Sequence, residues 1–66
     1  MITIARVEKL AFNQKDPQIV ELRGLSTDTK PTEIGGIKVG NGSIFVEIDT
    51  GNIFLYDQEN EEWKAI

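Results

Sequence analysis

Residues 43–57, with the sequence SIFVEIDTGNIFLYD, carry the clearest structural pattern in the chain. Aliphatic side chains stand at every second position over 44–48 and again over 53–56, which is the period of a half-buried β-strand. The Asp, Gly and Asn residues between the two runs are typical of a turn, so the pattern predicts a β-hairpin. The acidic turn DQENEE and the final WKAI add a third strand. We therefore predict a three-stranded antiparallel meander over residues 43–66.

The N-terminal third of the chain also favours strands. The sequence holds nine Ile, four Val and five Thr against four Leu, and β-branched residues favour strands. QIVELR (18–23) follows an Asp-Pro break and is a predicted strand. Residues 1–12 fit a strand by their opening alternation and a helix by the later spacing of their apolar residues. The missing N-cap pattern favours the strand.

A Gly-rich segment, residues 24–43, contains five Gly and one Pro. A stretch this long without regular structure is usually functional or a linker. EIGGIKV (33–39) predicts one short strand, and GNGS (40–43) predicts a tight turn because Gly and Asn tolerate positive φ. We expect the segment to order on contact with a neighbouring subunit.

Together these segments predict an all-β fold, either a small antiparallel sheet or a partly open barrel or sandwich. Residues 1–66 form a single small β domain, with N-terminal strands or an arm at 1–23, the Gly-rich loop at 24–43 and the meander at 43–66. A chain of this length buries only about 60% of its unfolded surface. With no Cys and no His, disulfides and the usual zinc ligand sets are excluded. Oligomerisation or docking on a larger body is the compensation that remains.

The charge is −4 and is concentrated at the C-terminal end, where residues 49–66 carry five acidic groups and one basic group. An acidic chain without a basic stripe is a poor candidate for binding nucleic acid, whose affinity rests on phosphate neutralisation. No 18-residue apolar run and no signal-peptide pattern occur, so we expect no membrane segment and synthesis in the cytoplasm.

The triplet Asp49-Thr50-Gly51 after an apolar strand is also how aspartic proteases present a catalytic carboxylate. Such an enzyme needs two carboxylates that share a proton, which a chain with one triplet could supply only as a symmetric dimer. The hairpin interpretation needs less: Asp49 accepts backbone hydrogen bonds, Thr50 fits a type I turn and Gly51 takes the positive-φ position. We favour the turn and expect no enzymatic activity.

Aromatic residues are the remaining candidates for a binding surface. Tyr56 and Trp63 are the candidate protein-interface residues, since Tyr and Trp are typical interface anchors. Phe45 and Phe54 are expected in the core. Residues 57–61 alternate acids like the start of a calcium loop, but the required Gly and the bidentate acid at the twelfth position are missing. A solvated turn is favoured over calcium there, and no cofactor is expected.

Two parts of the chain, GLSTDTKPTE and GNGSIFVEIDTGNIFLYDQENEEW, resemble a signature of small structural proteins of tailed bacteriophages and prophages. In that signature a Ser-Thr-Asp-x-Lys-Pro-Thr segment leads to a Gly-Ser-x-Phe-x-Glu-x-Asp-Thr-Gly hairpin, an apolar-aromatic strand, an acidic or Asn-rich turn and a Trp. The connection EIGGIKVGN departs from it, and residues 1–23 carry no part of it. The matching residues are Ser26 to Thr32, Gly42, Ser43, Glu47, Asp49 to Gly51, Tyr56, Asp57 and Trp63.

The resemblance implies a non-enzymatic phage or prophage protein of the head-fibre or capsid-decoration type, located in the virion and made in the host cytoplasm. Its partners would be proteins: further copies of itself, the major capsid protein or another virion protein. A homo-oligomer is expected, and a trimer would suit a fibre or a local capsid axis. The alternative is a receptor- or carbohydrate-binding module of a tail appendage, using exposed aromatics with Asp57 and Asn60.

Overall fold

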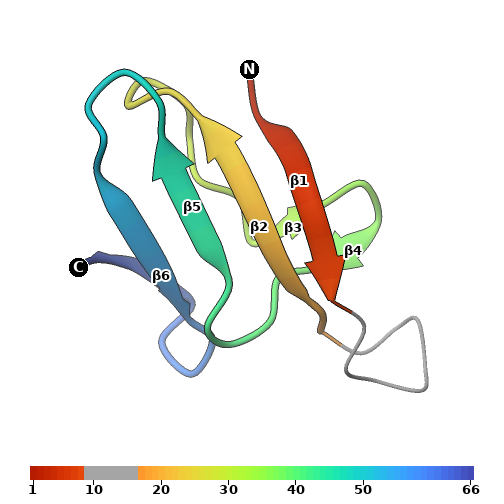
Figure 1. Ribbon diagram of the computed structural model, residues 1–66. Helices are drawn as coiled ribbons and strands as arrows, with labels where there is room; N and C mark the ends of the chain where they lie inside the picture. The colour runs from red at the N-terminus through yellow and green to blue at the C-terminus, as the bar shows by residue number, and fades with distance from the viewer. Residues whose placement is uncertain (9–16) are drawn as a thin grey trace.

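The computed structural model describes residues 1–8 and 17–66, and these residues contain strands and no helix. A five-stranded sheet has the order β1-β2-β5-β6-β7, and β3 and β4 pair separately as a small hairpin (Figure 1). The all-β prediction is confirmed. The part of the N-terminal prediction that concerns residues 9–12 lies outside the described residues. The strands are β1 (Thr3–Glu8), β2 (Ile19–Gly24), β3 (Glu33–Ile34), β4 (Ile37–Lys38), β5 (Ile44–Glu47), β6 (Ile53–Asp57) and β7 (Glu62–Ala65).

The predicted meander is confirmed as β5, β6 and β7, each antiparallel to the next. The loop between β5 and β6 is closed by the Gly51 amide, which donates to the Glu47 carbonyl at 2.8 Å. Gly51 has φ +78°, the left-handed conformation that favours glycine. The Asp-Thr-Gly triplet therefore forms the corner of a hairpin, as its turn chemistry predicts.

One pairing differs from the expected antiparallel sheet, because β2 runs parallel to β5 and makes the sheet mixed. Parallel neighbours cannot be joined by a tight turn and need a crossover of a dozen residues or more. The Gly-rich segment is this crossover. It leaves the end of β2, passes over one face of the sheet and returns to the start of β5.

The crossover contains a hairpin where one short strand was predicted. Its turn is Gly35-Gly36, with φ of +57° and +76°, and Ile34 and Ile37 pair on either side. Positive φ at both central residues defines a type I′ turn, whose twist suits a two-residue hairpin. The predicted GNGS turn is also present, and Gly42 supplies its positive φ.

The sheet has two unlike faces. The inner face, which the crossover covers, carries the buried side chains of Val20, Leu22, Phe45 and Tyr56, and Val39 of the crossover completes this core. The segment thus packs on its own sheet, and the expectation that it orders only against a neighbouring subunit is wrong for the single chain. Ile34 and Ile37 of the hairpin pack on the same core.

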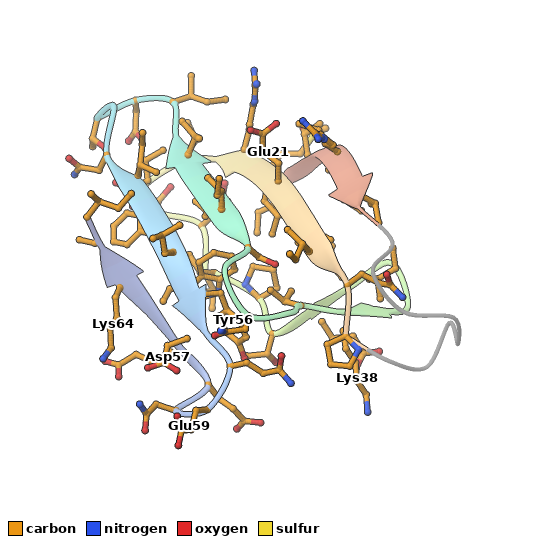
Figure 2. All side chains as sticks on the ribbon, turned by 60° about the horizontal axis from the view of Figure 1, so that its bottom comes forward. Glu21, Lys38, Tyr56, Asp57, Glu59 and Lys64 are labelled. Atoms are coloured by element: carbon orange, nitrogen blue, oxygen red, sulfur yellow. The ribbon has the colours of Figure 1, made fainter. Side chains whose placement is uncertain are left out.

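The opposite side of the sheet is here called the outer face. By strand register its centre is apolar and its margins are charged. None of the described segments lies across it, and Figure 2 shows Glu21 on this side and Tyr56 on the other. Its apolar residues are Ile19, Ile44, Val46, Ile53 and Leu55, and its charged residues include Arg6, Glu21, Arg23, Asp57, Glu62 and Lys64.

Candidate interaction surface

The two halves of the sequence signature meet in space. Ser26, in the turn after β2, donates its backbone N–H to Asp49 Oδ1 at 3.0 Å and its hydroxyl to Asp49 Oδ2 at 2.6 Å. The Ser26 hydrogen bonds hold the pKa of the Asp49 carboxyl below its usual value. From the sequence we predicted that Asp49 accepts hydrogen bonds from the backbone of its own turn. The structure adds Ser26 as a partner, 23 positions away. Asp49 therefore ties the crossover to the β5–β6 loop.

A second contact joins the same two segments deeper in the molecule. Lys30 Nζ lies 2.7 Å from Glu47 Oε2, and both side chains are largely buried. Thr50 donates its hydroxyl to Glu47 Oε1 at 2.7 Å. These partners, Lys30 first, lower the pKa of Glu47. The ammonium group also lies 4.2 Å from the centroid of Phe54 and 4.9 Å from that of Phe45, within cation–π range.

Trp63, at the end of the signature, contacts the crossover from strand β7. Its indole N–H donates to the Pro31 carbonyl at 2.9 Å. Its ring meets Phe45 edge-on at 5.9 Å and Tyr56 at 5.0 Å between centroids. Aromatic pairs at these distances stabilise a core beyond the area that they bury. Trp63 thus holds the crossover on the inner face.

The structure places both predicted interface residues on the inner face. Tyr56 is only 4% exposed, and Trp63 is partly buried with its N–H bonded inside the chain. Phe45 is fully buried, as expected of a core residue. A role of Tyr56 or Trp63 in contacting a partner stays a prediction, and their rings contribute to this chain's own packing.

The remaining signature residues also have local roles. Ser43 is fully buried; its hydroxyl accepts the Val20 N–H at 3.0 Å and donates to the Gly40 carbonyl at 2.8 Å. Asp57, proposed for sugar binding together with Asn60, instead accepts both the backbone and the side-chain N–H of Asn60. That pair closes the turn between β6 and β7, and the Asn60 bonds are the first cause of a lowered Asp57 pKa.

Sequence reasoning missed Lys30 and Glu47 as partners. The available signal was their joint presence in the signature, since a Lys in one half and a Glu in the other at an inward-facing strand position are suited to an ion pair. Periodicity alone could not join them, because the two residues are 17 positions apart.

No segment among residues 1–8 and 17–66 covers the outer face of the sheet. Ile53 and Leu55 are 42% and 41% exposed, and Ile66, which donates its N–H to the Ile53 carbonyl beside them, is 81% exposed. A hollow of about 140 Å³ opens on this face near Arg6, Ile19 and Ile44. Apolar surface gathered on one side of a small domain is typical of a protein contact.

Comparison with protein-family models, curated proteins and solved structures finds no match to this chain. Among the residues that the structure describes, no helix could span a membrane, and no group of three or more acidic side chains could hold a metal ion.

Proposed function

We propose that the chain is a non-enzymatic structural protein of a phage or prophage virion, of the head-fibre or capsid-decoration type, and that it acts by associating with further copies of itself through the outer face. The observation that carries this proposal is the apolar centre of that face, left open by a crossover that covers only the inner face. The signature resemblance supplies the virion context.

The charges of the outer face support a second copy as the occupant. Its described side chains include three basic residues and three acidic ones, within a chain whose net charge is −4. Two ion pairs neutralise charge within the face: Arg23 lies 3.9 Å from Glu21, and Lys64 lies 3.5 Å from Asp57. Two copies can therefore approach on this face with less charge repulsion than elsewhere on the acidic chain.

The size of the outer face sets the expected strength of the contact between two copies. Five strands spaced about 4.8 Å apart and about five residues long, at about 3.3 Å per residue, give a flat area near 400 Å². A stable interface buries about 800 Å² on each partner. One face-to-face contact should therefore be weak and dependent on concentration, and further contacts in a closed ring or on a capsid lattice would strengthen it.

The local role of Asp49 supports a protein without enzymatic activity. Its carboxylate accepts hydrogen bonds from Ser26, and these bonds lower its pKa. The carboxyl pair of an aspartic protease instead needs one carboxyl that keeps its proton. We expect no peptide cleavage at acidic pH by the purified protein. Cleavage that disappears in Asp49→Asn would contradict the proposal.

Light scattering behind a sizing column, over a range of protein concentrations, tests the self-association. We expect the mass to rise above the 7.4 kDa of one chain as concentration rises. Leu55→Glu should hold the protein at the monomer mass. Leu25→Glu is the matched control, because Leu25 is also 41% exposed but lies outside the strands.

Three outcomes decide the matter, each on samples shown to be folded by circular dichroism. Association lost in Leu55→Glu and kept in Leu25→Glu supports the outer face. A wild-type monomer at every concentration rejects self-association and directs the search to capsid proteins. Association that survives Leu55→Glu places the contact on another surface.

A further inference from the structure

The hydroxyl of Tyr56 is the starting point for a second site. Tyr56 is only 4% exposed, and its hydroxyl, which makes no hydrogen bond to the described residues, is the polar end of the side chain that reaches solvent. Burial is the first cause that raises the pKa of this phenol, followed by the charges of Glu61 and Asp57. A Tyr that buries its ring and keeps its hydroxyl at the surface can offer that hydroxyl to a ligand.

This hydroxyl belongs to a groove between the β3–β4 hairpin and the turn after β6, with a volume of about 420 Å³. Figure 2 labels Tyr56 and Lys38, two residues of this groove, in the lower half of the view. The volume lies in the range of about 300–1,000 Å³ that is usual for small-molecule sites. Pro17 and Val39 supply apolar contacts, and the polar groups come from Thr32, Glu33, Lys38, Tyr56, Gln58 and Glu61.

The polar groups of the groove are free to act on a ligand. Glu33, Lys38 and Glu61 form no ion pair within the part of the chain that the structure describes. Gln58 uses its side-chain oxygen to accept the Asn41 N–H at 3.1 Å, which leaves its amide N–H groups as donors. The groove thus offers two carboxylate acceptors, an ammonium and an amide as donors, and two hydroxyls that can do both.

From this set we infer that the groove binds a neutral, polyhydroxylated ligand, a sugar unit, with the Tyr56 hydroxyl as its central contact. Each sugar hydroxyl can donate to Glu33 or Glu61 and accept from Lys38 or Gln58, while Pro17 and Val39 contact the C–H face. An anion would meet the two carboxylates, and a cation would meet Lys38. A neutral ligand therefore suits the groove better than a ligand with a single charge.

The groove lies on the inner side of the sheet, opposite the outer face. Sugar binding and self-association can therefore succeed or fail separately. Variants in the groove should leave the mass in solution unchanged, and Leu55→Glu should leave sugar binding unchanged.

Saturation-transfer difference NMR and amide shift changes test the inference with glucose, galactose, mannose, rhamnose, N-acetylglucosamine and N-acetylgalactosamine as probes. We expect at least one sugar to bind with Kd on the order of 1–10 mM, which suits a ligand of this size. Tyr56→Phe keeps the ring and removes only the hydroxyl, so it should weaken binding about tenfold. Its unfolding midpoint should equal that of the wild type.

Glu61→Gln should also weaken binding, and Glu59→Gln is its matched control, since Glu59 lies in the same turn but does not line the groove. Three results would overturn the inference: no signal from any probe with folded wild-type protein, equal binding by the wild type, Tyr56→Phe and Glu61→Gln, or a marked loss of stability in Tyr56→Phe. The last would mean that the hydroxyl is bonded inside the protein.

Discussion

Truncation of Trp63 should strongly destabilise this protein, because the indole holds the crossover on the inner face. Trp63→Ala removes the N–H bond to Pro31 and the ring contacts with Phe45 and Tyr56. Trp63→Phe keeps a ring in place and removes the N–H donor. The pair of variants separates the hydrogen bond from the packing.

The expected cost follows from the contacts of the indole. Burial of about 100 Å² of a partly buried Trp contributes about 2.5 kcal/mol. Two aromatic pairs contribute about 1–3 kcal/mol together, and the hydrogen bond contributes about 1 kcal/mol. These contributions overlap, so we expect about 4 kcal/mol for Trp63→Ala, which agrees with other aromatic-to-alanine changes in cores. Trp63→Phe should cost about 1 kcal/mol.

Urea unfolding followed by far-UV circular dichroism measures both changes, and it does not depend on tryptophan fluorescence. Domains of 66 residues have total stabilities of about 3–10 kcal/mol, so Trp63→Ala should lose a large share of the total and unfold at a much lower urea concentration. Two protein concentrations show whether association contributes. Leu25→Ala is the control, expected within about 0.5 kcal/mol of wild type. If Trp63→Ala keeps the wild-type midpoint but changes the mass in solution, Trp63 acts at an interface and the reasoning is refuted.

Three further predictions concern the contacts that set the fold. Acid should destabilise the protein, because Lys30 lowers the pKa of Glu47 and Ser26 lowers the pKa of Asp49. The two carboxylates contribute their full stabilisation above the unfolded pKa values of about 4, and this stabilisation is lost as pH falls through the lower folded pKa values. Thermal unfolding midpoints between pH 7 and pH 2 check this, and a midpoint that is constant below pH 5 would contradict it. Ser43→Ala should cost about 1–3 kcal/mol because it leaves the buried Val20 N–H without its acceptor, as urea titration would show, with an unchanged midpoint counting against it. Gly36→Ala should cost about 1–2 kcal/mol from its φ of +76° alone, since nothing lies within 4 Å of an added Cβ; a stabilised variant in the same titration would show that the turn adopts another conformation.

Local chemistry accounts for the parts of the fold that sequence reasoning predicted. The meander follows from period-2 alternation and from a Gly at the one turn position of its first loop that has positive φ, both of which act between near neighbours. β2 was predicted for the same reason. The β3–β4 hairpin was underpredicted because each of its strands has only two residues, too few to show a period.

The candidate sites were harder to predict, because burial depends on which face the crossover covers. Alternation shows that β5 and β6 have two apolar faces, and it does not say which one is exposed. Tyr56 and Trp63 stood out as aromatics, yet the structure places their rings on the inner face. The groove at Tyr56 gathers residues from β3, β4, β6 and two turns, so no local pattern predicts it.

The sequence by itself determined an all-β chain with a C-terminal meander, because strand period and turn residues act over a few positions. Only the tertiary structure decided that β2 pairs parallel to β5 and that the Gly-rich segment lies on the inner face. The contacts that hold this arrangement join Ser26 to Asp49, Lys30 to Glu47 and Pro31 to Trp63, across 23, 17 and 32 positions. Such pairs form only when the chain has closed those loops, so the free energy that selects them belongs to the folded whole.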